Sequence, residues 1–135
     1  MAGINRETGK WLSGWLHVVQ SLGVLFTTTY GQRVMRRYFG SQVPGLLGEN
    51  LTSATVLKFI SAVVVAIELW EPRFRVSKVD VDPDANTPER LRQGFLAMSV
   101  RGVYRPRALS GDFTPARGEY VLSVGLAGST IKVSE

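Results

Sequence analysis

The chain has 135 residues, enough for one domain and too few for two of ordinary size. Hydrophobic residues make up 44% of it and charged residues 20%, which is typical of a globular chain and not of a disordered one. The sequence holds no cysteine and a single histidine, His17, which excludes disulfides and thiolate metal sites and argues against a histidine metal cluster or a histidine-centred triad. We therefore expect no metal and no cofactor.

Sixteen Lys and Arg against eleven Asp and Glu give a net charge of +5, and twelve of the sixteen are arginine, which favours paired contacts with carboxylates or phosphates.

No segment of the sequence is typical of an export signal or of a membrane span. The opening MAGINRETGKW is polar and mixed in charge, without the apolar core of a signal peptide. The most apolar stretch, 56–70, contains Lys58, Ser61 and Glu68 and is shorter than the roughly 20 residues that span a bilayer. We expect a soluble protein without a membrane partner.

The first helix is predicted from residue 16 onward. Apolar residues recur there at helical spacing until three threonines, 27–29, break the pattern: Val18, Val19, Leu22, Leu25 and Phe26. The basic segment 31–40, GQRVMRRYFG, is predicted as a short helical segment with Gly40 as its C-cap. Residues 41–50, SQVPGLLGEN, are predicted as mostly loop, because Pro44, Gly45 and Gly48 fall within ten residues.

The clearest helix follows, with Thr52 or Ser53 as its N-cap. One apolar stripe at helical spacing marks it: Val56, Leu57, Ile60, Val63, Val64 and Ile67. Pro72 ends it, because the residue before a proline is pushed out of the helical region.

After Pro72 the apolar period changes from 3.6 toward 2. Phe74 and Val76 share one phase and Val79 and Val81 the other, which predicts a bulge or bend near 77–78. Residues 82–88 are predicted as a loop, and Thr130 to Val133 as a last short strand. Between them lie two strand faces: Leu96, Met98, Val100 and Tyr104, then Tyr120, Leu122, Val124 and Leu126. Helices first and strands second predict an α+β fold, one domain over 1–135, with a small, mostly antiparallel C-terminal sheet.

Two functions remain open from composition. A lysozyme-like enzyme that cleaves glycans could use Glu68 and Glu71, three residues apart at the helix end, but the adjacent Arg73 would stabilise a charged carboxylate where a general acid is needed. His17 has no nucleophile motif beside it. A nucleic-acid-binding protein could use the arginine-rich segments 31–40 and 90–117, although no helix-turn-helix, zinc-finger or RNA-binding motif accompanies them.

The most specific string is Trp70-Glu71-Pro72-Arg73, where the long helix stops and a strand starts at once. Proline fixes the backbone between two opposite charges and so makes a rigid corner. Those charges could pair with each other as an internal brace, pair with Arg36 or Arg37, or meet polar groups of a docking chain.

The first 81 residues resemble the baseplate wedge proteins of contractile phage tails and related injection machines, the family of the W protein and the gene-25-type sheath initiator. The strings that carry the resemblance are Thr8-Gly9, His17 with Gln20-Ser21, TTTYGQRVMRRYFGS at 27–41, Pro44 with Leu46-Leu47, and ELWEPRFRVSKVDV at 68–81. The R-V-M-R-R-x-x-G-S string and the W-E-P-R corner together are highly specific.

The resemblance implies a structural, non-enzymatic protein of the virion tail baseplate, assembled in the host cytoplasm. It implies that Glu71, Pro72 and Arg73 contact the helical core bundle of the larger wedge subunits, with Arg33, Arg36, Arg37 and Trp70 in support. It also implies that an edge of the C-terminal sheet accepts strands from the tail sheath protein, and the candidate edge residues are Tyr120, Leu122, Val124, Ile131 and Val133. Hub or tube-initiator proteins are further candidate partners, and nucleic acid is not an expected one.

Overall fold

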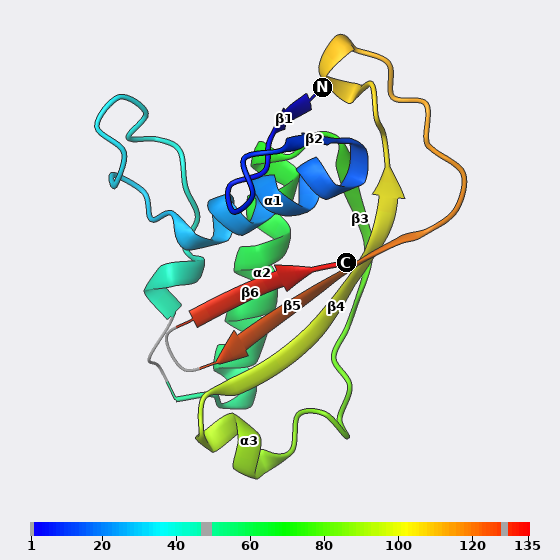
Figure 1. Cartoon of the computed structure of the whole chain (residues 1–135). Helices are drawn as coiled ribbons and strands as arrows, with labels where there is room; N and C mark the ends of the chain where they lie inside the picture. The colour runs from blue at the N-terminus through cyan, green and yellow to red at the C-terminus, as the bar shows by residue number, and fades with distance from the viewer. Residues whose placement is uncertain (1, 47–49, 128–129) are drawn as a thin grey trace.

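A computed structural model describes residues 2–46, 50–127 and 130–135 of the chain, and it confirms the α+β fold class (Figure 1). The elements in chain order are β1 Ala2–Ile4, β2 Trp11–Ser13, α1 Gly14–Thr27, a 3-10 turn at Val43–Leu46, α2 Ser53–Trp70, β3 Phe74–Asp80, α3 Pro88–Arg92, β4 Phe95–Tyr104, a 3-10 turn at Ala108–Ser110, β5 Tyr120–Ala127 and β6 Thr130–Ser134.

The C-terminal sheet has the order β3-β4-β5-β6, with every neighbouring pair antiparallel. The register shifts between Val76 and Lys78, so the bulge predicted from the change of apolar phase is confirmed. Alternate residues of β4 and β5 are buried, as the strand patterns predicted, and the residues between them leave the other sheet face open. The sheet therefore has a helix-covered face and an uncovered one.

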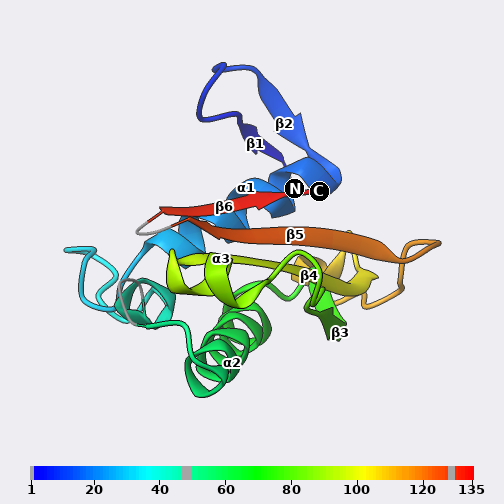
Figure 2. The same cartoon turned by 90° about the horizontal axis from the view of Figure 1, so that it is seen from below.

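α1 and α2 supply the helical layer. α1 runs antiparallel beside β6, and α2 lies behind the sheet on its β3 side (Figures 1 and 2). Their buried side chains join those of β4 and β5 in one core: Val18, Leu22, Leu25 and Phe26 from α1, with Phe59, Val63, Ala66 and Ile67 from α2.

α2 begins and ends as predicted, but its buried face is rotated from the predicted stripe. The Thr52 hydroxyl accepts a hydrogen bond from Thr55 N, which makes Thr52 the N-cap. Leu57 was expected in the core and is 64% exposed, whereas Phe59 is 1% exposed. The aromatic ring fills more of the core than a leucine one-half turn away, so the helix turns Phe59 inward and Leu57 outward.

By length and by a mean hydropathy of 1.7, α2 could also cross a membrane. A core helix meets the same criteria, and α2 buries Phe59, Val63 and Ile67 against the sheet and α1.

The predicted helix over 31–40 is wrong: these residues form a closed loop. Its ends meet, because Ser41 N donates to Thr28 O and Thr29 pairs with Ser41 in a parallel bridge. Gly40 makes this closure sterically feasible, since its φ is +148° and a Cβ there would lie 2.8 Å from the Thr29 carbonyl carbon. The backbone hydrogen bonds of this segment therefore run across the loop, where the predicted helix would have had bonds between successive turns.

Three further features were not predicted. A two-stranded sheet pairs β1 with β2 and stands away from the sheet beyond α1 (Figure 2). The segment 41–50 is mostly loop as expected but contains the turn Val43–Leu46; Leu47 and Gly48 lie outside the described residues. α3 starts within the predicted 82–88 loop, where the Thr87 hydroxyl caps a helix whose first residue is Pro88.

Candidate functional site

The corner between α2 and β3 is a tight, hydrogen-bonded turn. Glu71 N donates to Ile67 O at 2.9 Å as the last bond of α2, and Phe74 N donates to Glu71 O at 3.2 Å as β3 begins. Arg105 N donates to Arg73 O at 2.7 Å and ties the corner to the end of β4. Backbone bonds on both sides of Pro72 hold the turn in one conformation.

The two charges of the corner pair with each other inside the protein. Arg73 Nε donates to Glu71 Oε1 at 2.7 Å and Arg73 Nη2 donates to Oε2 at 2.8 Å, a bidentate pair. Glu71 is 3% exposed and Arg73 is 4% exposed, while Pro72 between them is exposed. Of the pairings that the sequence left open, the structure has the internal brace.

His17 extends the brace from α2 to the N-terminal hairpin. Arg73 Nη1 lies 2.8 Å from His17 Nδ1, and because arginine can only donate, Nδ1 accepts and the ring is neutral. Burial lowers the pKa of His17 below 6.5, and the Arg73 charge lowers it further. The other side of the ring packs on β1, because a Cβ on Gly3 would lie 2.7 Å from His17 Nε2.

Gln20, one turn along α1, fixes the same hairpin. Its Nε2 donates to Ile4 O at 3.0 Å and its Oε1 accepts from Arg6 N at 2.9 Å. Analysis of the sequence assigned no role to His17 or Gln20. Their spacing of three on one helix was the available signal, since such residues share a face.

The loop 31–40 packs against the end of α2 through aromatic contacts. Tyr38 stacks on Trp70 with ring centroids 5.9 Å apart, and Phe39 meets Trp70 edge-on at 5.1 Å. The Arg33 guanidinium lies over the Phe39 ring at 4.3 Å.

The tip of this loop faces solvent. Arg36 and Arg37 are exposed, and neither forms an ion pair with any residue that the structure describes. Val34 and Met35 beside them are 79% and 92% exposed. The loop therefore offers two free guanidinium groups and two apolar side chains next to the corner.

The predicted sheath-edge residues divide into two groups. Tyr120 packs in an aromatic cluster, with its ring 4.9 Å from Trp15 and 5.2 Å from Tyr104. Leu122 and Val124 are buried in the core. The interpretation of β5 as a free edge is wrong along Ser123–Ala127, because β6 pairs with β5 there.

Ile131 and Val133 do lie on an edge strand. β6 is the last strand of the sheet, and no backbone hydrogen bond reaches its outer side from any described residue. Both side chains are half-buried on the helix-covered face.

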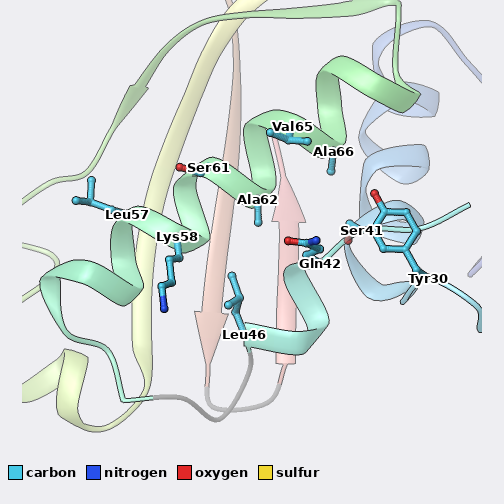
Figure 3. Close-up of a pocket in the computed structure, with 10 residues that line it drawn as sticks. All are labelled: Tyr30, Ser41, Gln42, Leu46, Leu57, Lys58, Ser61, Ala62, Val65 and Ala66. Carbon is cyan, nitrogen blue, oxygen red and sulfur yellow. The ribbon is translucent and has the colours of Figure 1, made fainter.

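A shallow pocket of about 470 Å³ lies along α2, between that helix and the segments that carry Tyr30, Gln42 and Leu46 (Figure 3). Leu57, Ala62 and Val65 give it an apolar wall, and Lys58 is the charged residue of its described lining. No carboxylate faces into it from the described residues.

The two carboxylates of the enzymatic alternative do not form a catalytic pair. Glu68 is exposed and its Oε1 lies 3.4 Å from Val76 N, while both oxygens of Glu71 are bound by Arg73. Among the described residues no group of three His, Cys, Asp or Glu could hold a metal ion.

Part of the C-terminal arginine excess is paired within the chain. Arg101 binds Asp80 at 2.9 Å and Glu119 at 3.6 Å, and Arg107 binds Asp112 at 2.9 Å. These pairs reduce the basic surface that a nucleic acid would use.

Comparison with known proteins gives consistent matches. Residues 13–107 match the family described as "Baseplate wedge protein gp25". The chain is 36% identical to Baseplate protein W of Escherichia phage P2 over 100 residues, which are 74% of this chain and 81% of that protein.

Two solved structures share the fold. One is a chain of the postcontracted pyocin R2 baseplate, with a TM-score of 0.60 and 29% identity over 77% of this chain and 98% of that one. The other, from Geobacter sulfurreducens and described as a "putative tail lysozyme", has a TM-score of 0.60 and 23% identity over 86% and 93% of the two chains. At that identity it supports the fold alone. With its W-E-P-R corner, its arginine loop and these matches, the chain belongs to the baseplate wedge protein gp25 family, the structural proteins of contractile-tail baseplates.

Proposed function

We propose that this chain is an inner wedge subunit of a contractile-tail baseplate with two docking regions. The outer edge of β6 accepts a strand from the tail sheath protein and so initiates sheath assembly. The corner at 71–73, with the loop 31–40 beside it, docks on the core-bundle helices of the larger wedge subunits. The observation that carries the proposal is the outer edge of β6, to which no residue that the structure describes forms a backbone hydrogen bond.

An exposed strand edge presents a row of unpaired N–H and C=O groups to solvent. Monomeric proteins usually cover such an edge, because an exposed edge promotes aggregation. An incoming strand would bind these groups through backbone hydrogen bonds, while alternate side chains would set its register.

In this proposal the charged residues of the corner do not contact the partner directly, as the sequence-based hypothesis had them do. Glu71 and Arg73 are buried and bind each other, so their part is to fix the shape of the corner. Pro72 offers the exposed contact, and Arg36 and Arg37 offer charge for acidic residues of a bundle helix. Trp70 supports the loop through Tyr38 and Phe39.

We assign no catalytic role to the chain. Glu68 lies on the surface and Glu71 is bound in the brace, so neither carboxylate is placed to act as a general acid.

Co-purification of the chain with its own wedge and sheath proteins tests the proposal. Wild type is expected to retain both partners. The double variant Arg36→Glu/Arg37→Glu should lose the wedge proteins and keep the sheath protein, because the two arginines lie on exposed loop surface and their reversal should leave the fold intact.

The matched control is Arg92→Glu/Arg117→Glu, which reverses two exposed arginines elsewhere and should keep both partners. Wild type that retains neither partner would contradict the proposed function. Equal loss in test and control variants would show that total charge matters and the loop does not.

A further inference from the structure

The indole N–H of Trp70 is buried without a hydrogen-bond acceptor. Among the described residues that are not themselves exposed, Trp70 Nε1 is the one buried side-chain nitrogen or oxygen that has no partner. The neighbouring carboxylate of Glu71 is not its acceptor, because Arg73 binds both of its oxygens. A buried donor without an acceptor destabilises a folded chain. Phenylalanine would supply an aromatic ring here without that cost, so the N–H itself needs a role.

The loop 31–40 lies over the ring of Trp70. Tyr38 stacks on the indole with an angle of 22° between the ring planes, and Phe39 meets it edge-on. Tyr38 is itself 63% exposed. A single layer of side chains from the loop therefore separates this part of the indole from solvent.

The loop is hydrogen-bonded to itself and not to α2. Gly31 N donates to Arg37 O at 2.8 Å, and Phe39 N donates to Arg36 O at 3.0 Å. In the part of the chain that the structure describes, no hydrogen bond or ion pair joins residues 31–40 to α2. Aromatic contacts hold the loop against the helix, so it can move away as a unit without breaking its own backbone bonds.

The other surroundings of the indole are fixed. The last hydrogen bond of α2 runs from Glu71 N to Ile67 O, and the outer end of the corner is tied to β4 by Arg105 N. The base of the loop is also fixed, because Ser41 N donates to Thr28 O and its hydroxyl donates to Leu25 O. Movement that uncovers the indole must therefore come from the loop above its base.

The charges of the loop indicate which acceptor would reach the N–H. Arg36 and Arg37 are exposed, and no described residue forms an ion pair with either. Arginine pairs most strongly with carboxylates, which can bind it through two oxygens. An ionised Asp or Glu side chain accepts several hydrogen bonds at once, so one carboxylate can accept from an arginine and from an indole N–H together.

We propose that the loop 31–40 is a movable cover and that Trp70 is a binding residue beneath it. The inference rests on the proposed docking on the wedge subunits and names the partner group that the site takes. In the free chain, Tyr38 and Phe39 cover the indole. In the complex, the loop moves off α2 about its base, and Trp70 Nε1 donates to a carboxylate of the partner while Arg36 and Arg37 bind carboxylates beside it.

An isosteric replacement of the indole tests the donor. Site-specific incorporation of β-(3-benzothienyl)alanine at position 70 puts sulfur in the place of the N–H and keeps the shape of the ring system. The Tm of the free chain should rise by about 4 °C, because a buried donor without an acceptor has been removed. The dissociation constant for the purified wedge proteins should rise about tenfold, because the complex loses a hydrogen bond to a charged acceptor.

The variant Tyr38→Ala tests the cover. The side chain is largely exposed, so its removal should leave the fold intact while it weakens the closed position of the loop. Binding to the wedge proteins should become about threefold tighter, because less free energy is spent on uncovering Trp70. A tyrosine that contacts the partner on a fixed loop would give the opposite sign.

Two matched controls accompany these variants. The same benzothienyl replacement at Trp11, which is 77% exposed, should change neither Tm nor wedge binding. Phe113→Ala removes another exposed aromatic side chain, far along the chain from the loop, and should bind as wild type does.

The outcomes separate this inference from the function on which it rests. If wild type does not bind the wedge proteins, the proposed docking fails. If wild type and the position-70 analogue bind equally well, docking stands and the role of the N–H is wrong. A Tm of that analogue no higher than that of wild type would show that the N–H already has an acceptor in the free chain, which overturns the inference. Equal or weaker binding by Tyr38→Ala would overturn the movable cover.

Discussion

The corner and the β6 edge, the two regions that we assign to docking, differ in how well their polar groups are satisfied within the chain. At the corner, Arg73 binds both Glu71 and His17, and the turn's backbone is hydrogen-bonded on both sides of Pro72. At β6, no described residue binds the outer backbone groups. The corner is thus rigid before any partner arrives, whereas the edge reaches its complete set of contacts in a complex.

This difference suggests a division of labour. A preformed corner can dock without the entropic cost of ordering itself, which favours a fixed geometry in the wedge. An open edge gains new backbone hydrogen bonds when a strand is added, which favours a partner that brings an extended segment.

The largest expected effect comes from breaking the brace. Arg73→Ala would leave the Glu71 carboxylate buried without its partner, and we expect a loss of about 3–5 kcal/mol in the free energy of unfolding. Denaturant unfolding of the purified variant measures it. This differs from the sequence-based hypothesis, in which Arg73 contacts the core bundle of the wedge subunits directly.

A double variant separates the two parts that the brace could play. Glu71→Leu/Arg73→Met removes both charges together, and replacing a buried pair by apolar residues is often close to neutral. If the pair acts only by holding the corner, this variant should fold and still bind the wedge proteins. A folded double variant that no longer binds them would mean that the charges themselves contact the partner.

A smaller effect is expected from pH at the same brace. The pKa of His17 is lowered in the folded protein, so the stability that its neutral ring contributes is complete above pH 6.5 and is lost as the pH falls below 6.5. The groups that face the ring are Arg73, its hydrogen-bond donor, and Glu71, whose charge opposes the shift.

Unfolding curves between pH 7.5 and about 5 measure this effect. His17→Asn keeps an acceptor for Arg73 without a titrating group, so it should reduce the slope of stability against pH. An unchanged slope in that variant would assign the acid sensitivity to other groups.

Much of the fold could be predicted from the sequence where one local signal dominated. Pro72 ended α2, and the shift of apolar phase between Val76 and Val79 located the bulge. The same reading failed over 31–40, because the contacts that decide its conformation are distant: Ser41 with Thr28, and Tyr38 with Trp70. Helix propensity in a basic segment could not reveal them.

The position of the candidate site in the chain could be predicted from the sequence, but the direction in which its side chains point could not. The string Trp70-Glu71-Pro72-Arg73 predicted a rigid corner, yet only the fold shows that both charges point inward. The edge was assigned to β5 as well as β6, since two apolar strands of similar pattern do not reveal which one is last in the sheet.

Hydrogen–deuterium exchange of the chain, alone and with its sheath protein, tests the central contrast most directly. We expect the outward amides of Thr130–Ser134 to exchange quickly in the free chain and to become protected in the complex, since a strand then pairs with β6. The amides of Glu71 and Phe74 should be protected in both states, because the corner is already hydrogen-bonded. A complex that forms without new protection along β6 would contradict the account.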